Sequence, residues 1–301
     1  MIAALDLGLI YGVMALGVYL TFRVLDFPDL TVDGSFTTGA AVTASMILAG
    51  QSPLLATALG GVAGILAGIT TGLLHTKGKI NPLLAGILSQ IALYSINLRI
   101  MGKANLSLLR TDTLLSPMLE ARLFGTWVSV GIFAAVGVAF KVALDWFLTT
   151  DLGLAIQATG DNEDMIRSLG VSTDGTKILG LAISNGLVAL SGGLMAQYQG
   201  YADIGMGIGL IVAGLASVII GQAIFGQRTI WLATLAVLLG SVVYRLVIQI
   251  ALGVGLNPND MKLISAVLVV AALLLPRSGA LRLYRIRRRA RQLEQLEKAQ
   301  G

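Results

Sequence analysis

The sequence lacks the residues on which several classes of protein depend. None of its 301 residues is cysteine, which excludes disulfide bonds and thiolate metal sites. A single histidine, His75, argues against a metal site built from imidazole ligands. No Gly-x-x-x-x-Gly-Lys-[Ser/Thr] segment occurs, so the chain has no phosphate-binding loop of its own. The chain is therefore neither a disulfide scaffold nor, by itself, a P-loop ATPase.

Charged residues are also scarce. They make up 12% of the chain, whereas a soluble domain carries roughly a quarter. Hydrophobic residues reach 55%, and the mean hydropathy is +0.83. Because so little polar surface cannot cover a globule of this length, the chain must face lipid. Its 37 glycines agree with this, since membrane helices use glycine for close backbone contact.

Nine apolar segments are candidates for membrane-spanning helices, each of which needs about 20 mostly apolar residues. They cover residues 2–22, 34–50, 53–75, 81–101, 125–147, 178–198, 209–226, 229–250 and 262–276. The segments 34–50, 209–226 and 262–276 are short for a full span. We therefore expect an all-α polytopic membrane protein with about nine transmembrane helices, some of them short or broken.

Lysine and arginine gather in alternate loops. One set of loops carries Arg23, Lys77, Lys79, Arg167, Lys177, Arg228 and the arginines of the tail. Cytoplasmic loops retain an excess of positive charge, so the N-terminus is expected outside and the C-terminus in the cytoplasm. The basic tail, residues 277–301, is expected to contact anionic membrane lipid and not nucleic acid.

The two halves of the chain are similar in their order of segments. The glycine-containing apolar stretches 7–17 and 179–192 resemble each other, and each is followed by an irregular polar or glycine-rich stretch, at 25–34 and 200–209. A short helix of small residues comes next in both halves. The odd helix 125–147 lies between the halves, which would give them opposite orientations in the membrane.

Such inverted repeats with interrupted helices are typical of transport proteins, whose substrate route lies between the halves. Irregular backbone at membrane depth is tolerated only where protein or a water-filled path satisfies its polar groups. The free N–H groups at the start of helix 34–50 would also favour an anion such as a carboxylate. Tight packing of glycine-rich joins is the alternative explanation of either stretch taken alone.

Residues 148–177 form the longest loop on the expected cytoplasmic side. Asp161 or Asn162 can cap a helix of about two turns, and Gly170 can end it. Its apolar side chains are expected on one face: Met165, Ile166 and Leu169. A helix this short is marginal alone in water, so that face must pack on the chain's own bundle or on another protein.

The segment 150–170 resembles the ATPase-coupling loop of ABC importer permeases of the branched-chain amino acid and ribose type. The family's Gly-x-Ala-x-x-Ala-x-Gly-x-Asn core is represented by Gly153, Ala155, Ala158, Gly160 and Asn162. The segment 25–40, LDFPDLTVDGSFTTGA, is more similar still to a subgroup often assigned to tryptophan and tyrosine uptake.

The resemblance implies a permease of the bacterial inner membrane that imports a small solute, an amino acid and possibly an aromatic one. Its implied partners are a cytoplasmic ABC ATPase, a second permease subunit (the same chain or a sister chain) and an extracytoplasmic substrate-binding protein. ATP and magnesium would be bound by the ATPase, and no cofactor by this chain. The implied coupling residues are Gly153, Ala155, Ala158, Gly160, Asn162, Met165, Ile166, Leu169 and Gly170.

The resemblance also implies a set of residues near the translocation path. These are Asp29, Thr31, Asp33 and Ser35, with Asn185 and Asp203 as rough counterparts in the second half. The same residues could instead cap helices and satisfy irregular backbone. The implied organisation is a transmembrane permease domain, 1–276, made of repeat one (about 5–101), linking helix 125–147, cytoplasmic coupling loop 148–177 and repeat two (about 178–276), then the tail 277–301.

Two other functions agree with part of these features. A sodium-coupled secondary transporter shares inverted repeats and broken helices. The charged residues of the spans are all expected near helix ends, which argues against proton coupling but not sodium coupling: Asp6, Arg99, Lys141, Asp145 and Arg245. An intramembrane enzyme would need a nucleophile with a base, paired carboxylates or a metal, and Ser191 has no suitable base. We expect a transport subunit without enzymatic activity of its own.

Overall fold

The protein is described by a computed structural model over residues 1–109, 111–255 and 261–274. Its helices are α1 (Ile2–Tyr19, continued by the π-helix η1, Leu20–Val24), α2 (Thr31–Leu48), α3 (Pro53–Thr76), α4 (Pro82–Met101), α5 (Ser116–Glu120), α6 (Trp127–Leu148), α7 (Asp151–Asp161), α8 (Glu163–Ser168), α9 (Thr173–Gln199), α10 (Leu210–Phe225), α11 (Ile230–Gly253) and α12 (Met261–Leu274). Two short strands, β1 (Asn105–Ser107) and β2 (Tyr201–Asp203), pair antiparallel. The expected all-α polytopic class is confirmed.

Helices occupy all nine of the expected apolar segments. Six are long and apolar enough to cross a membrane: α1 with η1, α3, α4, α6, α9 and α11. The other three are shorter or less apolar, as expected, with 18 residues in α2, 16 in α10 and 14 in α12. The tail 277–301, Arg110 and the side chain of Lys262 lie outside the described residues.

Local sequence explains several of the helix ends. Pro53 and Pro82 each open a helix at its first position, where proline has no N–H to leave unsatisfied. Asn81 caps α4 by accepting a hydrogen bond from the Leu83 N–H. α2 begins at Thr31, three residues earlier than expected, so Asp33 lies in its first turn.

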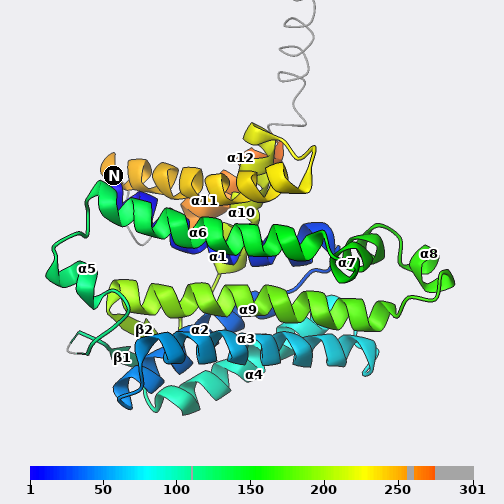
Figure 1. The fold of residues 1–301 in the computed structure, drawn as a ribbon, viewed down its shortest axis with the longest axis horizontal. Coiled ribbons are helices and arrows are strands. Elements are labelled where there is room, and N and C mark those ends of the chain that lie inside the picture. The colour runs from blue at the N-terminus through cyan, green and yellow to red at the C-terminus, as the bar shows by residue number, and fades with distance from the viewer. Residues whose placement is uncertain (110, 256–260, 275–301) are drawn as a thin grey trace, which may run out of the picture.

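The helices pack in the same order in both halves. α9 packs on α2 and α3, while α1 packs on α10 and α11; α2 also contacts α3 and α4, and α10 contacts α11 and α12. Figure 1 shows α1 and α9 side by side between the two groups. Exchanging α1 with α9, α2 with α10, α3 with α11 and α4 with α12 leaves this set of contacts unchanged.

Glycine allows α2 and α9 to touch through their backbones. A Cβ atom on Gly39 would lie 1.9 Å from the carbonyl oxygen of Ala189, and one on Gly192 would lie 2.0 Å from that of Phe36. No side chain fits at either position without moving a helix. This close contact joins the first half of the chain to the second.

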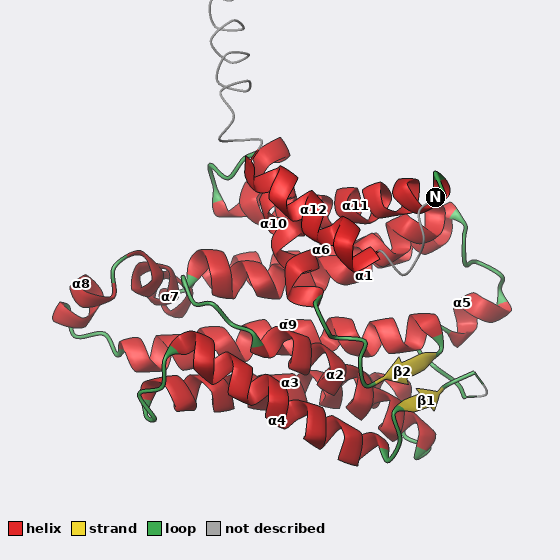
Figure 2. Ribbon diagram, turned by 180° about the vertical axis from the view of Figure 1, so that it is seen from behind, coloured by secondary structure: helices red, strands yellow, loops and turns green. Residues whose placement is uncertain are grey.

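The two ends of the bundle differ. α7 and α8 project from one end, and the N-terminus, α5 and the β1–β2 ribbon lie at the other (Figures 1 and 2). Basic residues of the expected cytoplasmic loops gather at the α7–α8 end. There Lys177 contacts Glu163, Lys77 contacts Asp174, and Arg23 donates a hydrogen bond to Gln227.

Candidate functional site

The stretch between η1 and α2, residues 25–30, is irregular. Its residue Asp29 is fully buried. The Asp29 carboxylate accepts hydrogen bonds from the Thr31 N–H (2.9 Å) and from the side-chain amide of Asn185 (2.7 Å). The Asn185 oxygen in turn accepts one from the Ser35 hydroxyl, at 2.7 Å. Asp29, Ser35 and Asn185 have side chains almost completely removed from solvent. Three of the expected path residues therefore form one hydrogen-bonded chain across the two halves.

Asp33 holds the second interrupted stretch. Its carboxylate accepts hydrogen bonds from the N–H groups of Gly209 and Ile211, both at 2.8 Å, at the N-terminus of α10. A carboxylate there satisfies otherwise unpaired donors and suits the positive end of the helix dipole. The Thr37 hydroxyl accepts a further hydrogen bond from the Gly207 N–H, at 3.1 Å. Residues of α2, in the first half, therefore hold the N-terminal end of α10, in the second half, in place.

The side chains of the two remaining expected path residues have partners outside this chain of hydrogen bonds. Thr31 exchanges a 2.8 Å hydrogen bond with Thr71, which donates to Ser89, so it ties α2 to α3 and α4. Asp203 lies in β2, where it accepts hydrogen bonds from the Gly205 N–H and the Asn105 side chain. The structure therefore places Asp203 in the ribbon and not in the Asp29–Asn185–Ser35 chain.

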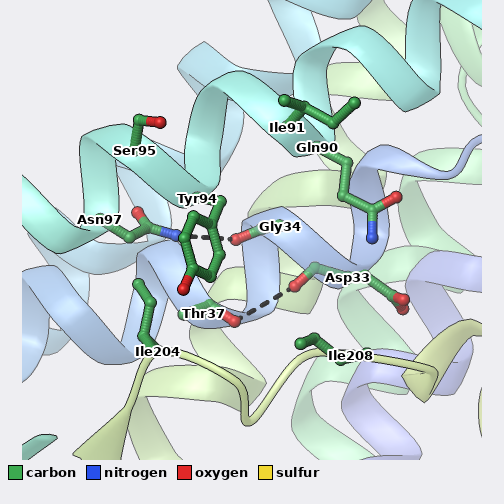
Figure 3. Close-up of a pocket in the computed structure, with 10 residues that line it drawn as sticks. All are labelled: Asp33, Gly34, Thr37, Gln90, Ile91, Tyr94, Ser95, Asn97, Ile204 and Ile208. Atoms are coloured by element: carbon green, nitrogen blue, oxygen red, sulfur yellow. Dashed lines mark hydrogen bonds between the residues drawn. The ribbon is translucent and has the colours of Figure 1, made fainter. Parts of the chain in front are cut away.

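A cavity of about 430 Å³ lies against the first turns of α2 (Figure 3). We call it the Asp33 cavity; it is lined by Asp33, Gly34, Thr37, Gln90, Ile91, Tyr94, Ser95, Asn97, Ile204 and Ile208. Figure 3 shows Gln90 and Tyr94 pointing from α4 toward α2. Amide, hydroxyl, aromatic and aliphatic groups surround one space whose volume is typical of a small-molecule site.

The α4 side of this cavity is absent from the sequence-based expectations. Gln90, Tyr94 and Asn97 stand in a segment whose composition indicates only an apolar span. Their spacing of three or four residues places them on one helix face, and that pattern of polar residues could have identified them. Asn97 is fully buried and donates to the Gly34 carbonyl at 3.4 Å.

The coupling segment contains two helices where one was expected. Thr150 caps α7 by accepting from the Gly153 N–H, and Asn162 caps α8 by accepting from the Met165 N–H. Gly170 follows α8 in the left-handed conformation, with φ of +88°. Asn162 and Gly170 thus have the capping roles expected of them, but α8 itself spans only Glu163–Ser168, and the whole of α7 was missed.

The glycines of the coupling motif allow close contacts between α7 and its neighbours α6 and η1. A Cβ on Gly153 would lie 2.2 Å from the Phe147 carbonyl oxygen, and one on Gly160 would lie 2.0 Å from that of Val24. Ala155 and Ala158 are small, partly buried residues of the same helix. Through Gly160, α7 rests directly on the end of η1, where the irregular stretch 25–30 begins.

The expected apolar face of α8 is divided. Ile166 is only 7% exposed, whereas Met165 is 49% and Leu169 71% exposed. Ile166 faces the protein's own helices, because α8 packs on α7 and α9. The expectation that all three side chains share one face is therefore wrong, since Leu169 lies beyond the last residue of the helix.

Ion pairs attach α8 to the bundle. Glu163 accepts hydrogen bonds from Lys177 of α9 (2.7 Å) and from Arg167 (2.8 Å). The hydrogen bond from Lys177 is the main cause that lowers the pKa of Glu163 below its ordinary value. Lys177 also lies 3.5 Å from the His75 ring. Within the described residues, no three side chains among histidine, aspartate and glutamate come together as a metal site.

Comparison with known proteins now adds to this geometry. The family model described as branched-chain amino acid transport system, permease component, matches residues 1–274. A tyrosine transport system permease protein of Clostridioides difficile is 45% identical over 276 residues, 90% of each chain. An uncharacterized protein of Rickettsia prowazekii is 36% identical over 277 residues, 91% of this chain and 96% of that protein.

More distant similarity extends to a second kind of importer. The autoinducer 2 import system permease protein LsrC of Escherichia coli is 32% identical over 196 residues, 64% of this chain and 55% of that protein. No solved structure gives a significant match.

Proposed function

The chain belongs to the branched-chain amino acid transport permease family and is a multi-pass inner-membrane protein, and from this we propose that it imports an amino acid with a separate ATPase. The 45% identical tyrosine permease supports an amino acid, aromatic ones included, as the substrate. In this proposal an extracytoplasmic binding protein delivers the substrate. A second permease subunit, identical or a sister chain, completes the path.

The coupling segment carries this proposal. Met165 and Leu169 expose large apolar side chains at the end of the bundle where charged residues gather, beside Glu163 and Arg167. Exposed apolar groups set among charges mark a protein–protein contact more than a lipid-facing surface. An ATPase that received Met165 and Leu169 would push on α7, and α7 rests on Val24 through Gly160. Movement would then reach Asp29 and the cavity beyond it.

The proposed arrangement in the membrane is nine helices in two inverted repeats with the N-terminus outside. The repeat is supported by the helix contacts, which are the same in both halves when α1 is matched with α9, α2 with α10, α3 with α11 and α4 with α12. The gathering of basic residues around α7 and α8 supports a cytoplasmic location for that end. α6, the helix between the halves, supplies the odd crossing that inversion requires.

The proposed path runs along α2, where the two interrupted stretches meet. Asp29, Ser35 and Asn185 would stabilise the break in the first half, and Asp33 would fix the second while lining the Asp33 cavity. Irregular backbone beside a cavity is the arrangement in which membrane proteins tolerate such breaks.

The test is co-purification of the full-length chain from its native membrane, wild type against Leu169→Asp. Wild type should bring a P-loop ATPase and a substrate-binding protein, identified by mass spectrometry. A charge at the centre of the contact should lower ATPase recovery about tenfold or more. Leu119→Asp is the matched control, an exposed leucine of α5 at the opposite end, and should retain the ATPase.

Normal ATPase recovery with Leu169→Asp would contradict the docking role of α8. Uptake by the purified chain alone, driven by a sodium gradient in vesicles without ATP, would favour a sodium-coupled carrier instead. Ile166→Asp is unsuitable for this test because Ile166 is buried, so its loss would disturb packing before docking.

A further inference from the structure

A second cavity, of about 520 Å³, lies between α1, α10, α11 and α12. We call it the Arg245 cavity. Its polar side chains are those of Tyr11, Tyr244, Arg245 and Ser265, and most of the rest of its lining is aliphatic or glycine. The strip 205–210, which leads into α10, forms one wall. Ile208 of this strip also lines the Asp33 cavity, so the strip borders both cavities.

Arg245 lies deeper in its helix than the sequence analysis expected. α11 continues to Gly253, so Arg245 is eight residues from its end, about 12 Å along a helix that rises about 1.5 Å per residue. Tyr11 lies at a similar depth, nine residues after Ile2 at the start of α1. In the proposed orientation, both belong to the extracytoplasmic half of the membrane. A charged residue at such a depth is costly and is usually functional.

The surroundings of Arg245, which is partly buried, differ from those of the buried cation Lys141. Lys141 lies 2.5 Å from the Asp145 carboxylate and over the Trp231 ring, so a purely structural role explains it. The guanidinium of Arg245 lies 3.8 Å from the centre of the Tyr11 ring. The ion pairs found among the described residues include none to Arg245, and its Nε is buried without a hydrogen-bond partner. This cation therefore has donor capacity that the described chain leaves unused.

The chemistry of the cavity matches one class of small molecule. A guanidinium presents N–H groups in a planar fork that binds a carboxylate through two hydrogen bonds. Tyr11 and Tyr244 add aromatic faces, and the aliphatic lining suits an apolar side chain. We propose that the Arg245 cavity binds the carboxylate of an amino acid with an apolar or aromatic side chain. This rests on the proposed function and extends it by naming the group that selects the substrate.

The absence of cysteine gives a direct test that needs no ATPase. Ala266→Cys places a single thiol in the wall of the cavity. Its modification by a methanethiosulfonate reagent is measured in membranes with L-phenylalanine, and separately with its decarboxylated form, phenethylamine. We expect L-phenylalanine to slow modification several-fold and phenethylamine to have no effect. In Ala266→Cys with Arg245→Gln, the protection should be lost, and with Arg245→Lys it should be reduced.

The same chain, without the added cysteine, is then assayed for ATP-driven uptake of L-phenylalanine with its ATPase and binding protein. Arg245→Gln should lower uptake about tenfold while ATPase recovery stays normal, because a carboxylate loses its charged partner. Arg99→Gln, an exposed arginine in the last turn of α4, is the matched control and should leave uptake unchanged.

The possible outcomes distinguish failure of the Arg245 carboxylate site from failure of the proposed ATP-driven import. Equal protection by both compounds, or unchanged protection in Arg245→Gln, would overturn the carboxylate site even if ATP-driven uptake is found. Protection that depends on Arg245, without any ATP-driven uptake, would uphold the site and contradict the proposed importer. Full protection in Arg245→Lys would contradict recognition of the carboxylate through two guanidinium hydrogen bonds, since a positive charge alone would then suffice.

Discussion

The two interrupted stretches, residues 25–30 and 200–209, follow corresponding helices but are held in different ways. In the first, Leu25 and Phe27 are buried in the core, and Asp29 is bound by Asn185 of the other half. The second is rich in glycine, leaves Ile208 exposed, and is fixed by Asp33 and Thr37. Each half thus stabilises the break in the other.

The difference in surroundings indicates a difference in task. The first stretch begins where Gly160 of α7 meets Val24, and Leu25 packs beside Gly180 and Ile156. It is well placed to receive motion from the coupling segment. The second stretch touches no part of that segment among the contacts described here, but it lines both the Asp33 cavity and the Arg245 cavity. In the proposed mechanism, the first stretch would transmit motion and the second would form a wall of the solute site.

The largest expected effect comes from removing the support of the second stretch. Asp33→Ala leaves the N–H groups of Gly209 and Ile211 without their charged acceptor. A hydrogen bond to a charged group contributes about 1.5–3 kcal/mol, so we expect the free energy of unfolding to fall by about 3 kcal/mol or more. Equilibrium unfolding in detergent measures it.

Two variants sharpen this prediction. Asp33→Asn keeps one acceptor oxygen and should lose less stability than Asp33→Ala. Asp203→Ala removes a carboxylate of the same kind from the partly exposed ribbon, where water can replace its hydrogen bonds, and should cost under about 1 kcal/mol. Equal losses in Asp33→Ala and Asp203→Ala would show that Asp33 does not support α10 as argued.

A smaller effect should come from the contact below the first stretch. Gly160→Ala would bring a Cβ within 2.0 Å of the Val24 carbonyl oxygen, so α7 must move away from η1. Such overpacking costs about 1–3 kcal/mol. We also expect ATP-driven uptake to fall several-fold while the ATPase still co-purifies, because Met165 and Leu169 stay exposed.

Gly175→Ala is the matched control for this change. Gly175 also lies in a helix, but an added Cβ would meet only Ser172 atoms at 3.4 Å or more. Alanine favours helix over glycine, so stability should be unchanged or slightly higher. Uptake by Gly160→Ala at the wild-type rate would remove the mechanical link between α7 and the first stretch.

The sequence predicted local features of this structure well and distant partners poorly. Runs of apolar residues indicated the helices. Asp161 or Asn162 was expected to start α8 and Gly170 to end it, and Asn162 and Gly170 have these roles, because capping depends on neighbouring residues. α7 was not predicted because its glycines are unfavourable for a helix. They serve close contacts with Phe147 and Val24, which the local sequence does not reveal. The pairing of Asp33 with the start of α10 joins residues 176 and 178 positions apart.

The depth of Arg245 in the membrane was also predicted incorrectly. Arg245 was expected near the end of a span that closed at residue 250, and three more helical residues place it almost one turn further from the helix end. Helix ends are the least certain part of a sequence-based assignment, and here that uncertainty concealed a candidate site. Polar residues of α4 were overlooked for a related reason, because mean hydropathy does not show which face they occupy.

The smallest effect is expected at the outer end of the coupling segment and depends on pH. Lys177 holds the pKa of Glu163 below its ordinary value, so the ion pair stabilises the fold above that value. As the pH falls through the lowered pKa, Glu163 is protonated in the folded protein too, and the stabilisation is lost. Glu163 is about one-third exposed, so solvent screens the pair and the effect is small.

Thermal unfolding of the full-length chain, followed from about pH 7 to about pH 3, measures this contribution. Glu163→Gln should lower the Tm slightly at neutral pH and converge with wild type in acid. Glu120→Gln, in α5 at the opposite end, should follow wild type throughout. A constant difference between Glu163→Gln and wild type at every pH would mean that packing, and not the ion pair, fastens α8 to α9.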